Sequence, residues 1–477
     1  MHIPALRAGE EYESIDQVTL ADHRDGTPLA KISQVGASIV RRDLARRVDK
    51  GTAALRALSS DRLLAICREA GQRFLEDTLP LNAQGDVQSP DDYVAALSAT
   101  SGMPYTLCRG NMAKIVTVFD EMGTILRGLM RGMDPAVLDT GVGEHTGVPV
   151  SYAPVGGSLG VVLPSNSPGV NSIWMPAIAL KVPVVLKPGR EEPWTPLRII
   201  RAFIAAGAPA EAFSFLPTDH EGSAAILAGT GRAQLFGDAS TTAKWAHDPR
   251  IELHGPGWSK VLIGEDEIDR WEEHLDVLAA AVLDNGGRSC INASSIFVPR
   301  HGDAIADALA RRAATIEPLP ADDENARLSA FANPKMAEFI ESSIERGLAA
   351  GGAEDVTARY RTGPRKVEFE GGLYLRPTIV RCTGPAQELA NTEFLFPFAS
   401  VVEVPESEVL DHIGHSLVVT AITRNADFVT RIVASPDIDR LNLGPVPTSH
   451  VDWDQPHEGN LFETLYRRRA IRRADGW

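Results

Sequence analysis

Leu159-Gly160-Val161-Val162-Leu163 and Val182-Pro183-Val184-Val185-Leu186-Lys187 are the stretches that decide the fold of this chain. Both are short, continuously apolar runs, which are typical of strands buried on both faces of a sheet. The expected order is a helix at 170–180 between them, then a helix at 195–206, a strand at 212–216, a helix at 221–228, and strands at 232–236 and 250–253. Strands that alternate with helices predict a doubly wound, parallel α/β sheet, which binds its ligand beyond the carboxyl ends of the strands.

The sequence on either side of this region predicts further parts. Residues 39–79 and 112–133 carry apolar side chains at three- and four-residue spacing, so helical packing is expected in the first quarter of the chain. A second alternation of strands and helices begins at residue 260 and predicts a second α/β lobe, because 477 residues exceed what one core organises. The boundary between the lobes is placed at Gly255-Pro256-Gly257.

The composition argues against several classes of function. A net charge of -16 opposes binding to nucleic acid and to anionic membrane surfaces. The apolar runs are shorter than the roughly 18 residues of a membrane-spanning helix, and the first residues lack the apolar centre of a signal peptide. Four cysteines without CxxC spacing fit reduced thiols, so a cytoplasmic protein is expected.

Cys290 is the candidate nucleophile of the chain. It lies in Asn285–Ser294 (NGGRSCINAS), after an expected helix and before an expected strand. Backbone N–H groups and a neighbouring arginine can lower the pKa of a thiol in such a setting. A buried structural role is more common for cysteine in general and describes Cys67, which falls on an apolar helical face. Cys108 and Cys382 carry no functional signal.

The order of motifs resembles that of the aldehyde dehydrogenase superfamily over nearly the whole chain. The six matching stretches are Leu163–Pro168 (LPSNSP, similar to P-W-N-F-P), Val184–Pro188 (VVLKP, similar to V-V-L-K-P), Ile251–Gly255 (IELHG, similar to L-E-L-G-G), Gly287–Cys290 (GRSC, similar to G-Q-x-C), Gly371–Thr378 (GGLYLRPT, similar to G-G-x-x-x-x-P-T) and Thr392–Pro397 (TEFLFP, similar to E-E-I-F-G-P). The resemblance implies three parts. These are a cofactor-binding lobe from 1–135 and 154–255, a catalytic lobe from 256–445, and oligomerisation strands with a C-terminal tail from 136–153 and 446–477.

The resemblance also implies a reaction, the oxidation of an aldehyde to a carboxylic acid with NAD or NADP. The thiolate of Cys290 would attack the aldehyde carbon, and the side-chain amide of Asn166 would stabilise the resulting oxyanion. Hydride would pass to the nicotinamide, and water activated by Glu252 would release the acid from its thioester. Trp174 has two open roles, as a wall of the aldehyde channel or as a core residue.

The same resemblance implies the residues that bind the dinucleotide. Lys187 and Glu393 would each contact one ribose. The other expected contacts are Pro164, Ser165, Gly189, Arg190, Gly237, Ser240, Leu253 and Phe396. No G-x-G-x-x-G follows a strand, so the pyrophosphate is expected at the turn Gly237–Thr241, where Asp238 departs from the family's G-S-T. Arg190 replaces a ribose-binding glutamate, which predicts tolerance for NADP.

Other interpretations of these motifs stay open. His254–Lys260 and Ala99–Pro104 also resemble acyl-CoA reductases, in which coenzyme A takes the place of water. Glu252 favours hydrolysis, because acylating members typically lack this carboxylate. A catalytically silent structural relative would share the same fold. No metal site is expected, since His412 and His415 are three residues apart without a third ligand nearby.

The expected partners are a small-molecule aldehyde and further copies of the chain. Trp174, Trp258 and Phe396 suggest that the aldehyde is partly apolar. Residues 142–153 and 460–472 correspond to strands that pair across subunits in the family, which implies a homodimer or a homotetramer.

Overall fold

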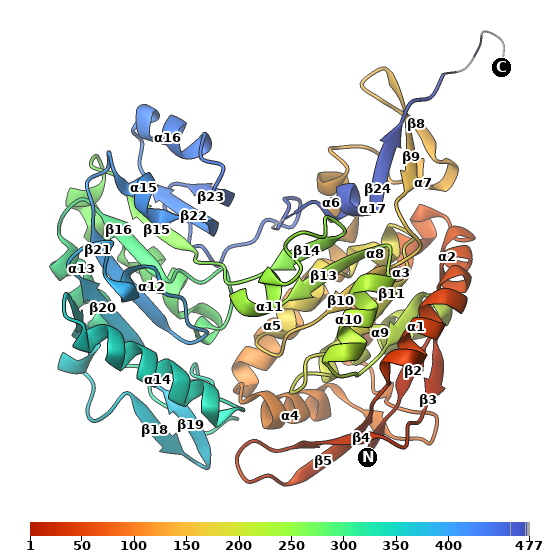
Figure 1. Cartoon of the computed structure of the whole chain (residues 1–477), viewed down its shortest axis with the longest axis horizontal. Coiled ribbons are helices and arrows are strands. Elements are labelled where there is room, and N and C mark those ends of the chain that lie inside the picture. The colour runs from red at the N-terminus through yellow and green to blue at the C-terminus, as the bar shows by residue number, and fades with distance from the viewer. Residues whose placement is uncertain (458, 473, 475–477) are drawn as a thin grey trace.

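Figure 1 shows the computed structural model, which describes residues 1–457, 459–472 and 474. Two α/β lobes lie side by side, and a small β element projects from the first lobe. The chain enters the second lobe after residue 254 and returns to the first after residue 443. Residues 458, 473 and 475–477, which belong to the predicted C-terminal element, lie outside the described residues.

The first lobe is built on a seven-stranded sheet, which confirms the predicted doubly wound fold. Its strands in spatial order are β14 (Ile251–His254), β13 (Arg232–Phe236), β10 (Leu159–Val162), β11 (Val184–Lys187), β12 (Phe213–Phe215), β2 (Ala5–Arg7) and β3 (Glu10–Tyr12). The five strands from β14 to β12 run parallel, and the last two pair antiparallel. The carboxyl ends of the parallel strands therefore meet at one edge, where a ligand is expected.

Helices cover both faces of this sheet. Leu186 and Phe215 pack with α3 and α9 on one face, while Val185 packs with α1 and α10 on the other. The helices of this lobe are α1 (Ala37–Arg46), α2 (Val48–Arg56), α3 (Ser60–Glu76), α4 (Pro90–Ser101), α5 (Tyr105–Asp120), α6 (Met122–Leu129), α9 (Trp194–Ala205) and α10 (His220–Gly229). The continuous apolar runs of β10 and β11 follow from burial on both sides.

Two predictions for this lobe are wrong in detail. The helix expected at 170–180 is a 3-10 helix, η1 (Pro168–Ile173), followed by the short α8 (Pro176–Ala179), because Pro176 has no N–H to continue a helix. The N-terminal segment forms strands that the sequence analysis did not identify, since such short strands carry little periodic signal. Besides β2 and β3 these are β1 (His2–Ile3), β4 (Gln17–Ala21) and β5 (Pro28–Ser33), and the hairpin β6 (Leu79–Pro80) and β7 (Val87–Gln88) lies further on.

The second lobe also contains a seven-stranded sheet. Its strands in spatial order are β17 (Ala353–Asp355), β20 (Thr378–Cys382), β21 (Phe398–Glu403), β16 (Ser295–Val298), β15 (Lys260–Ile263), β22 (Ser416–Ile422) and β23 (Ile438–Leu443). All but β17 run parallel. Its helices are α12 (Leu275–Leu283), α13 (Gly302–Ala313), α14 (Pro334–Ala349), α15 (Val409–Ile413) and α16 (Ala426–Val433), and the hairpin β18 (Lys366–Phe369) and β19 (Gly372–Leu375) lies beside α14.

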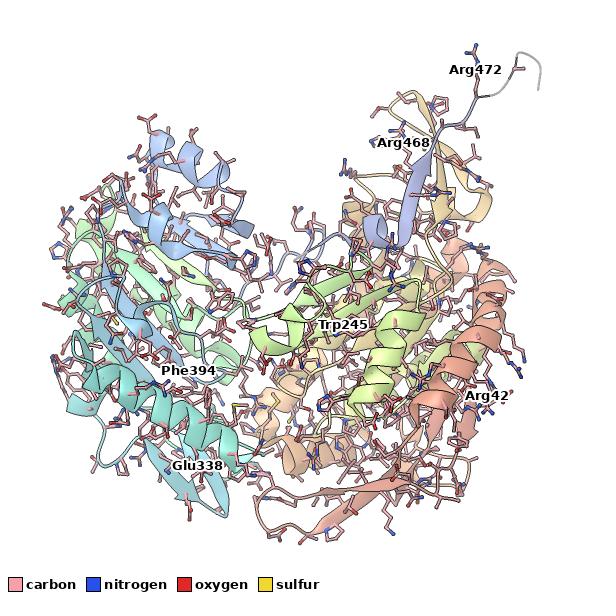
Figure 2. The ribbon with its side chains drawn as sticks, viewed as in Figure 1. Arg42, Trp245, Glu338, Phe394, Arg468 and Arg472 are labelled. Atoms are coloured by element: carbon pink, nitrogen blue, oxygen red, sulfur yellow. The ribbon has the colours of Figure 1, made fainter. Side chains whose placement is uncertain are left out.

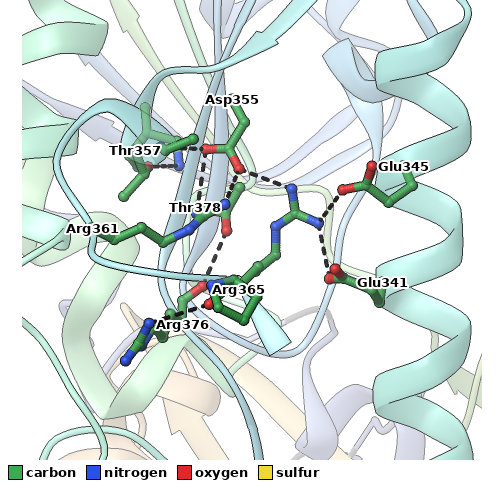
Figure 3. A network of polar contacts seen from close by, with 11 residues as sticks. Glu341, Glu345, Asp355, Thr357, Arg361, Arg365, Arg376 and Thr378 are labelled. Carbon is green, nitrogen blue, oxygen red and sulfur yellow. Dashed lines mark hydrogen bonds and ion pairs between the residues drawn. The ribbon is translucent and has the colours of Figure 1, made fainter. Parts of the chain in front are cut away.

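A buried cation ties α14 to this sheet (Figure 3). Arg365 is 3% exposed and donates to Glu341 and Glu345 of α14 at 2.9 and 3.0 Å, and to Asp355 of β17 at 2.8 Å. Arg361 donates to the same carboxylate of Asp355 at 2.7 Å. Charge-assisted contacts from two directions hold α14 in place, and this helix borders the site described below.

The small β element joins distant parts of the chain. It consists of β8 (Val142–His145), β9 (Val148–Pro154) and β24 (Tyr466–Arg469), with β24 and β8 antiparallel on either side of β9. The short helices α7 (Val137–Thr140) and α17 (Leu461–Leu465) lead into β8 and β24.

No helix among the described residues is both long and apolar enough to span a bilayer.

Candidate active site

Cys290 lies just after a glycine-rich turn, in the space between the lobes. The turn η4 (Asp284–Gly287) holds Asn285, Gly286 and Gly287 in the left-handed region, with φ of 52°, 63° and 65°, which glycine adopts readily. The other three cysteines are buried, and burial raises the pKa of each thiol. Cys290 is partly exposed and borders a cavity, so it is the cysteine placed for nucleophilic chemistry.

A reciprocal pair of hydrogen bonds fixes Asn166 against the Cys290 loop. Nδ2 of Asn166 donates to the carbonyl of Arg288 at 2.9 Å, and Nε of Arg288 donates to the carbonyl of Asn166 at 2.9 Å. Burial lowers the pKa of Arg288 to about 10, so the guanidinium stays charged at neutral pH and also donates to the carbonyl of Ser101. An amide nitrogen carries two hydrogens, so this pair uses only one of those on Asn166, whose side chain borders the same cavity as Cys290.

A cavity of about 680 Å³ opens beside Cys290, and we call it the cysteine cavity. Its polar lining includes Asn166, His254 and Glu393. Its apolar lining includes Val170, Phe236, Trp258, Phe339, Phe394 and Leu395. Both lobes contribute, and Figure 2 shows Phe394, one of the lining residues, in the second lobe. A mostly apolar space with a few polar groups beside a thiol suits a small organic molecule.

Glu393 belongs to the second-lobe wall of the cysteine cavity. Its carboxylate accepts a hydrogen bond from the N–H of Trp258 at 2.5 Å, and burial raises its pKa to about 7. Nζ of Lys260 donates to the carbonyl of Trp258 at 2.6 Å, and burial lowers the pKa of this ammonium group to about 7. Trp258 has a φ of 42°, so these two contacts hold a left-handed residue in place.

A second cavity, of about 830 Å³, lies at the carboxyl ends of β10, β11 and β13. Phe236 and Gly237 line both cavities, so the two spaces meet there. Lys187 borders the second cavity, burial lowers its pKa, and its ammonium group has no hydrogen bond or ion pair to any described residue. An added Cβ on Gly189 would lie 2.5 Å from Oγ of Ser165, so only glycine allows the segment after β11 to pass this close to the segment after β10. A partly buried cation that borders a cavity of this size suits the hydroxyl and phosphate groups of a dinucleotide.

Comparison with known proteins identifies the family. A model of the aldehyde dehydrogenase family matches residues 86–413. This chain belongs to the aldehyde dehydrogenase family.

Individual relatives are distant in sequence. The mitochondrial aldehyde dehydrogenase of Leishmania tarentolae is 25% identical over 278 residues, which cover 56% of this chain and 54% of that protein. The chain thus spans about half the length of the curated relatives it matches. The crystal structure of the aldehyde dehydrogenase KauB from Pseudomonas aeruginosa superposes with a TM-score of 0.79 at 18% identity, covering 98% of this chain and 96% of that one. The crystal structure of an indole-3-acetaldehyde dehydrogenase complexed with NAD+ superposes with a TM-score of 0.78 at 19% sequence identity, covering 98% of this chain and 95% of that one.

Most of the cofactor contacts implied by the family resemblance border these two cavities. They are Pro164, Ser165, Lys187, Gly189, Arg190, Gly237 and Glu393. Ser240 lies outside both linings and donates to Asp238 at 2.8 Å, while Asp238 accepts from the N–H of Thr241 at 2.7 Å. Asp238 therefore caps the short α11 (Ala239–Ala243) and occupies the place expected for an anion.

Three further family predictions fall elsewhere in the described structure. Phe396 is 3% exposed in the core of the second lobe, and its neighbours Phe394 and Leu395 line the cysteine cavity instead. Leu253 borders a separate small cavity. Trp174 is fully buried and donates to Oδ1 of Asn171 at 2.9 Å, so the structure gives it a core position.

Glu252 does not border the same cavity as Cys290 in the described structure. Its carboxylate borders a neighbouring cavity together with Trp453, and Thr464 donates to it at 3.2 Å. His254, which takes the place of a glycine in the family motif, lines the cysteine cavity, and its Nε2 lies 3.0 Å from Oε1 of Glu252. The sequence analysis noted His254 as a departure from the family motif without giving it a role. It considered the arginine beside Cys290 only for its effect on the pKa of the thiol and not for its hydrogen bond to Asn166.

Proposed function

We propose that this chain oxidises an aldehyde to a carboxylic acid with NAD+ or NADP+, through a covalent intermediate on Cys290. One observation carries the proposal. Cys290 and Asn166 border a cavity that shares Phe236 and Gly237 with a second cavity, which is bordered by Lys187; this lysine has no hydrogen bond or ion pair to a described residue. The proposed nucleophile, oxyanion donor and dinucleotide site would thereby be neighbours.

The first step uses Cys290 and Asn166. The thiolate sulfur attacks the aldehyde carbon, a carbon–sulfur bond forms, and the carbonyl electron pair moves onto oxygen. The second hydrogen of the Asn166 amide, together with the N–H of Cys290, is donated to that oxygen. A bound oxidised dinucleotide would supply the hydride acceptor, so that the carbon bonded to Cys290 could lose hydride and become the carbonyl carbon of a thioester.

Lys187 and Glu393 are proposed to hold the dinucleotide across the two cavities. Lys187 donates to ribose hydroxyls in the second cavity, and Glu393 accepts from hydroxyls of the other ribose in the cysteine cavity. Arg190 is exposed and borders the second cavity, where its guanidinium suits a 2′-phosphate. NADP+ is therefore proposed as a substrate alongside NAD+.

Water is the proposed nucleophile that releases the acid. Glu252 is the proposed base, because it borders a small cavity whose lining shares Gly255 and Pro256 with the cysteine cavity. If coenzyme A replaced water, the same thioester would give an acyl-CoA instead of a carboxylic acid. The two reactions differ in whether turnover requires coenzyme A.

A panel of aldehydes, supplied with NAD+ or NADP+ and with or without coenzyme A, tests this function. Absorbance of the reduced dinucleotide should rise without coenzyme A, and Cys290→Ala should abolish the rise. A strict coenzyme A requirement would replace hydrolysis by acylation. Full activity of Cys290→Ala would refute the proposed chemistry. Inactivity of the wild type across an aldehyde panel of varied size would favour a catalytically silent relative.

The small β element is proposed to join subunits into a homodimer or a homotetramer. The arginines of β24 are exposed, and the outer edges of β8 and β24 are unpaired among the described residues. Light scattering, which measures the molar mass in solution, tests this assembly. The whole chain should have the mass of a dimer or a tetramer, and Arg468→Pro, which disrupts β24, should lower it.

A further inference from the structure

A buried asparagine, Asn111, joins the two segments of the chain that carry Cys290 and Asn166. It lies on α5, and its side chain is 1% exposed. Helix α5 packs on η1 and on η4. Asn166 lies just before η1, and Cys290 lies just after η4. One side chain of the N-terminal helices therefore reaches both halves of the proposed oxyanion site.

Every polar atom of the Asn111 side chain has a chemically matched partner. Oδ1 accepts hydrogen bonds from the N–H of Gly169 and from Oγ of Ser167, both at 3.1 Å. Nδ2 donates to the carbonyl of Leu107 and to Oδ1 of Asn285, both at 2.8 Å. A backbone N–H can only donate and a carbonyl can only accept, so the backbone partners fix which end of the amide faces which segment.

Asn285 continues these contacts toward the nucleophile. Its Nδ2 donates to Oγ of Ser289 at 2.9 Å, and Ser289 directly precedes Cys290. The same nitrogen donates to Oγ of Ser167 at 3.3 Å, and Ser167 directly follows Asn166. The side chains of Asn111, Ser167 and Asn285 thus form a closed ring of hydrogen bonds, which we call the asparagine cluster.

The asparagine cluster is the second tie between these segments. The first is the reciprocal pair of hydrogen bonds between Asn166 and Arg288. Loss of one buried amide from the cluster would leave its partners without hydrogen bonds, and the two segments would have to move apart or turn to find others. The Asn166 amide would then shift relative to Cys290, and a displacement of about 1 Å at a reacting group can cost about 100-fold in rate.

We infer that Asn111 is a positioning residue of the oxyanion site, which sets the amide of Asn166 relative to the sulfur of Cys290; this inference rests on the proposed function. Asn111 acts through Asn285 on the segment of Cys290 and through Ser167 on the segment of Asn166. Its removal should therefore slow a reaction that forms an oxyanion. A reaction of the same sulfur that forms no oxyanion should be spared.

Two reactions of Cys290 separate these effects in the whole chain. Single-turnover formation of reduced dinucleotide, with the enzyme in excess over an accepted aldehyde, passes through the oxyanion. Alkylation by iodoacetamide, in which the sulfur displaces iodide from a saturated carbon, does not. In Asn111→Ser and Asn111→Leu the single-turnover rate should fall by about 100-fold, while the rate of Cys290 alkylation, followed by peptide mass, should change by less than about threefold. The pH midpoint of alkylation should not move, because the lost group is neutral.

A second variant removes the other amide of the asparagine cluster. Asn285→Gly introduces no strain, because glycine readily adopts the φ of 52° found here, and it should give the same pattern of rates. Asn82→Leu is the matched control. Asn82 is 3% exposed, donates to the carbonyl of His2 at 2.7 Å and to Oδ2 of Asp86 at 2.9 Å, and borders neither cavity in the described structure. This variant should lose stability as Asn111→Leu does, but keep both wild-type rates.

Two results would overturn the inference. Equal slowing of both reactions would mean that the asparagine cluster controls the thiol itself. Wild-type single-turnover rates in Asn111→Ser and Asn285→Gly would mean that the cluster positions nothing that the reaction needs. If both Asn111 variants melt early, the same two rates in Asn285→Gly decide. Failure of the proposed function is distinct, since the wild-type chain would then be alkylated at Cys290 but would reduce no dinucleotide with any aldehyde.

Discussion

Gly257→Ala should cripple catalysis while leaving the binding cavities largely intact. An added Cβ would lie 2.9 Å from the carbonyl carbon of Cys290 and 3.1 Å from its Cβ, and closer still to the carbonyl oxygen. Carbon atoms pack best at about 3.5–4.0 Å, so the Cys290 loop must move by about 0.5–1 Å. A displacement of about 1 Å at a reacting group can cost about 100-fold in rate, and overpacking costs about 1–3 kcal/mol of stability.

Steady-state kinetics with a saturating aldehyde test this prediction, with kcat expected to fall by about 100-fold and the KM for the dinucleotide to change by less than about threefold. Gly255→Ala is the matched control, because its added Cβ would approach only Oγ1 of Thr242, at 3.7 Å, an ordinary contact. A kcat of Gly257→Ala equal to that of the wild type would show that the added Cβ does not displace Cys290. An equal loss in both variants would mean that the loop tolerates no change, and that the specific contact with Cys290 is not the cause.

Three further predictions follow from individual side chains. Burial raises the pKa of Glu393 to about 7. The KM for the dinucleotide should therefore rise as pH falls through 7, because the carboxylate becomes protonated and is lost as a charged acceptor. In Glu393→Gln the KM for the dinucleotide should not change with pH over this range. Burial raises the pKa of Glu192 to about 8, so the folded state binds a proton that the unfolded state releases, and the protein loses stability as pH rises from about 4.5 to 8. Glu192→Gln should lack this trend and should melt about 2 °C higher than the wild type at pH 8. A lower melting temperature of the variant at pH 8 would contradict this prediction. Arg190→Glu should shift the ratio of kcat/KM for NADP+ over NAD+ by at least about tenfold toward NAD+, and an unchanged ratio would exclude Arg190 from recognition.

The fold was predictable where local signal and burial agree. The runs at 159–163 and 182–187 became β10 and β11 because strands covered on both faces must be apolar along their whole length. The helix expected at 170–180 failed because apolar periodicity does not register the break imposed by Pro176. The N-terminal strands could not be read from the sequence, since their partners lie far away in the chain.

The site was predictable where motif residues keep their family types. Asn166, Lys187, Cys290 and Glu393 all border the two cavities. The rest depends on side-chain direction, which one sequence does not specify. His254 replaces a residue without a side chain, and its ring now lines the cysteine cavity 3.0 Å from Glu252, a relation visible only in three dimensions.

Acid quenching followed by peptide mapping can detect the proposed thioester on Cys290. The wild-type chain, mixed with an accepted aldehyde and the oxidised dinucleotide, should yield a Cys290 peptide heavier by the acyl group. Cys290→Ser should yield none and should form no reduced dinucleotide. Rapid turnover with an acyl group on another residue, or with an equally active Cys290→Ser, would contradict the account.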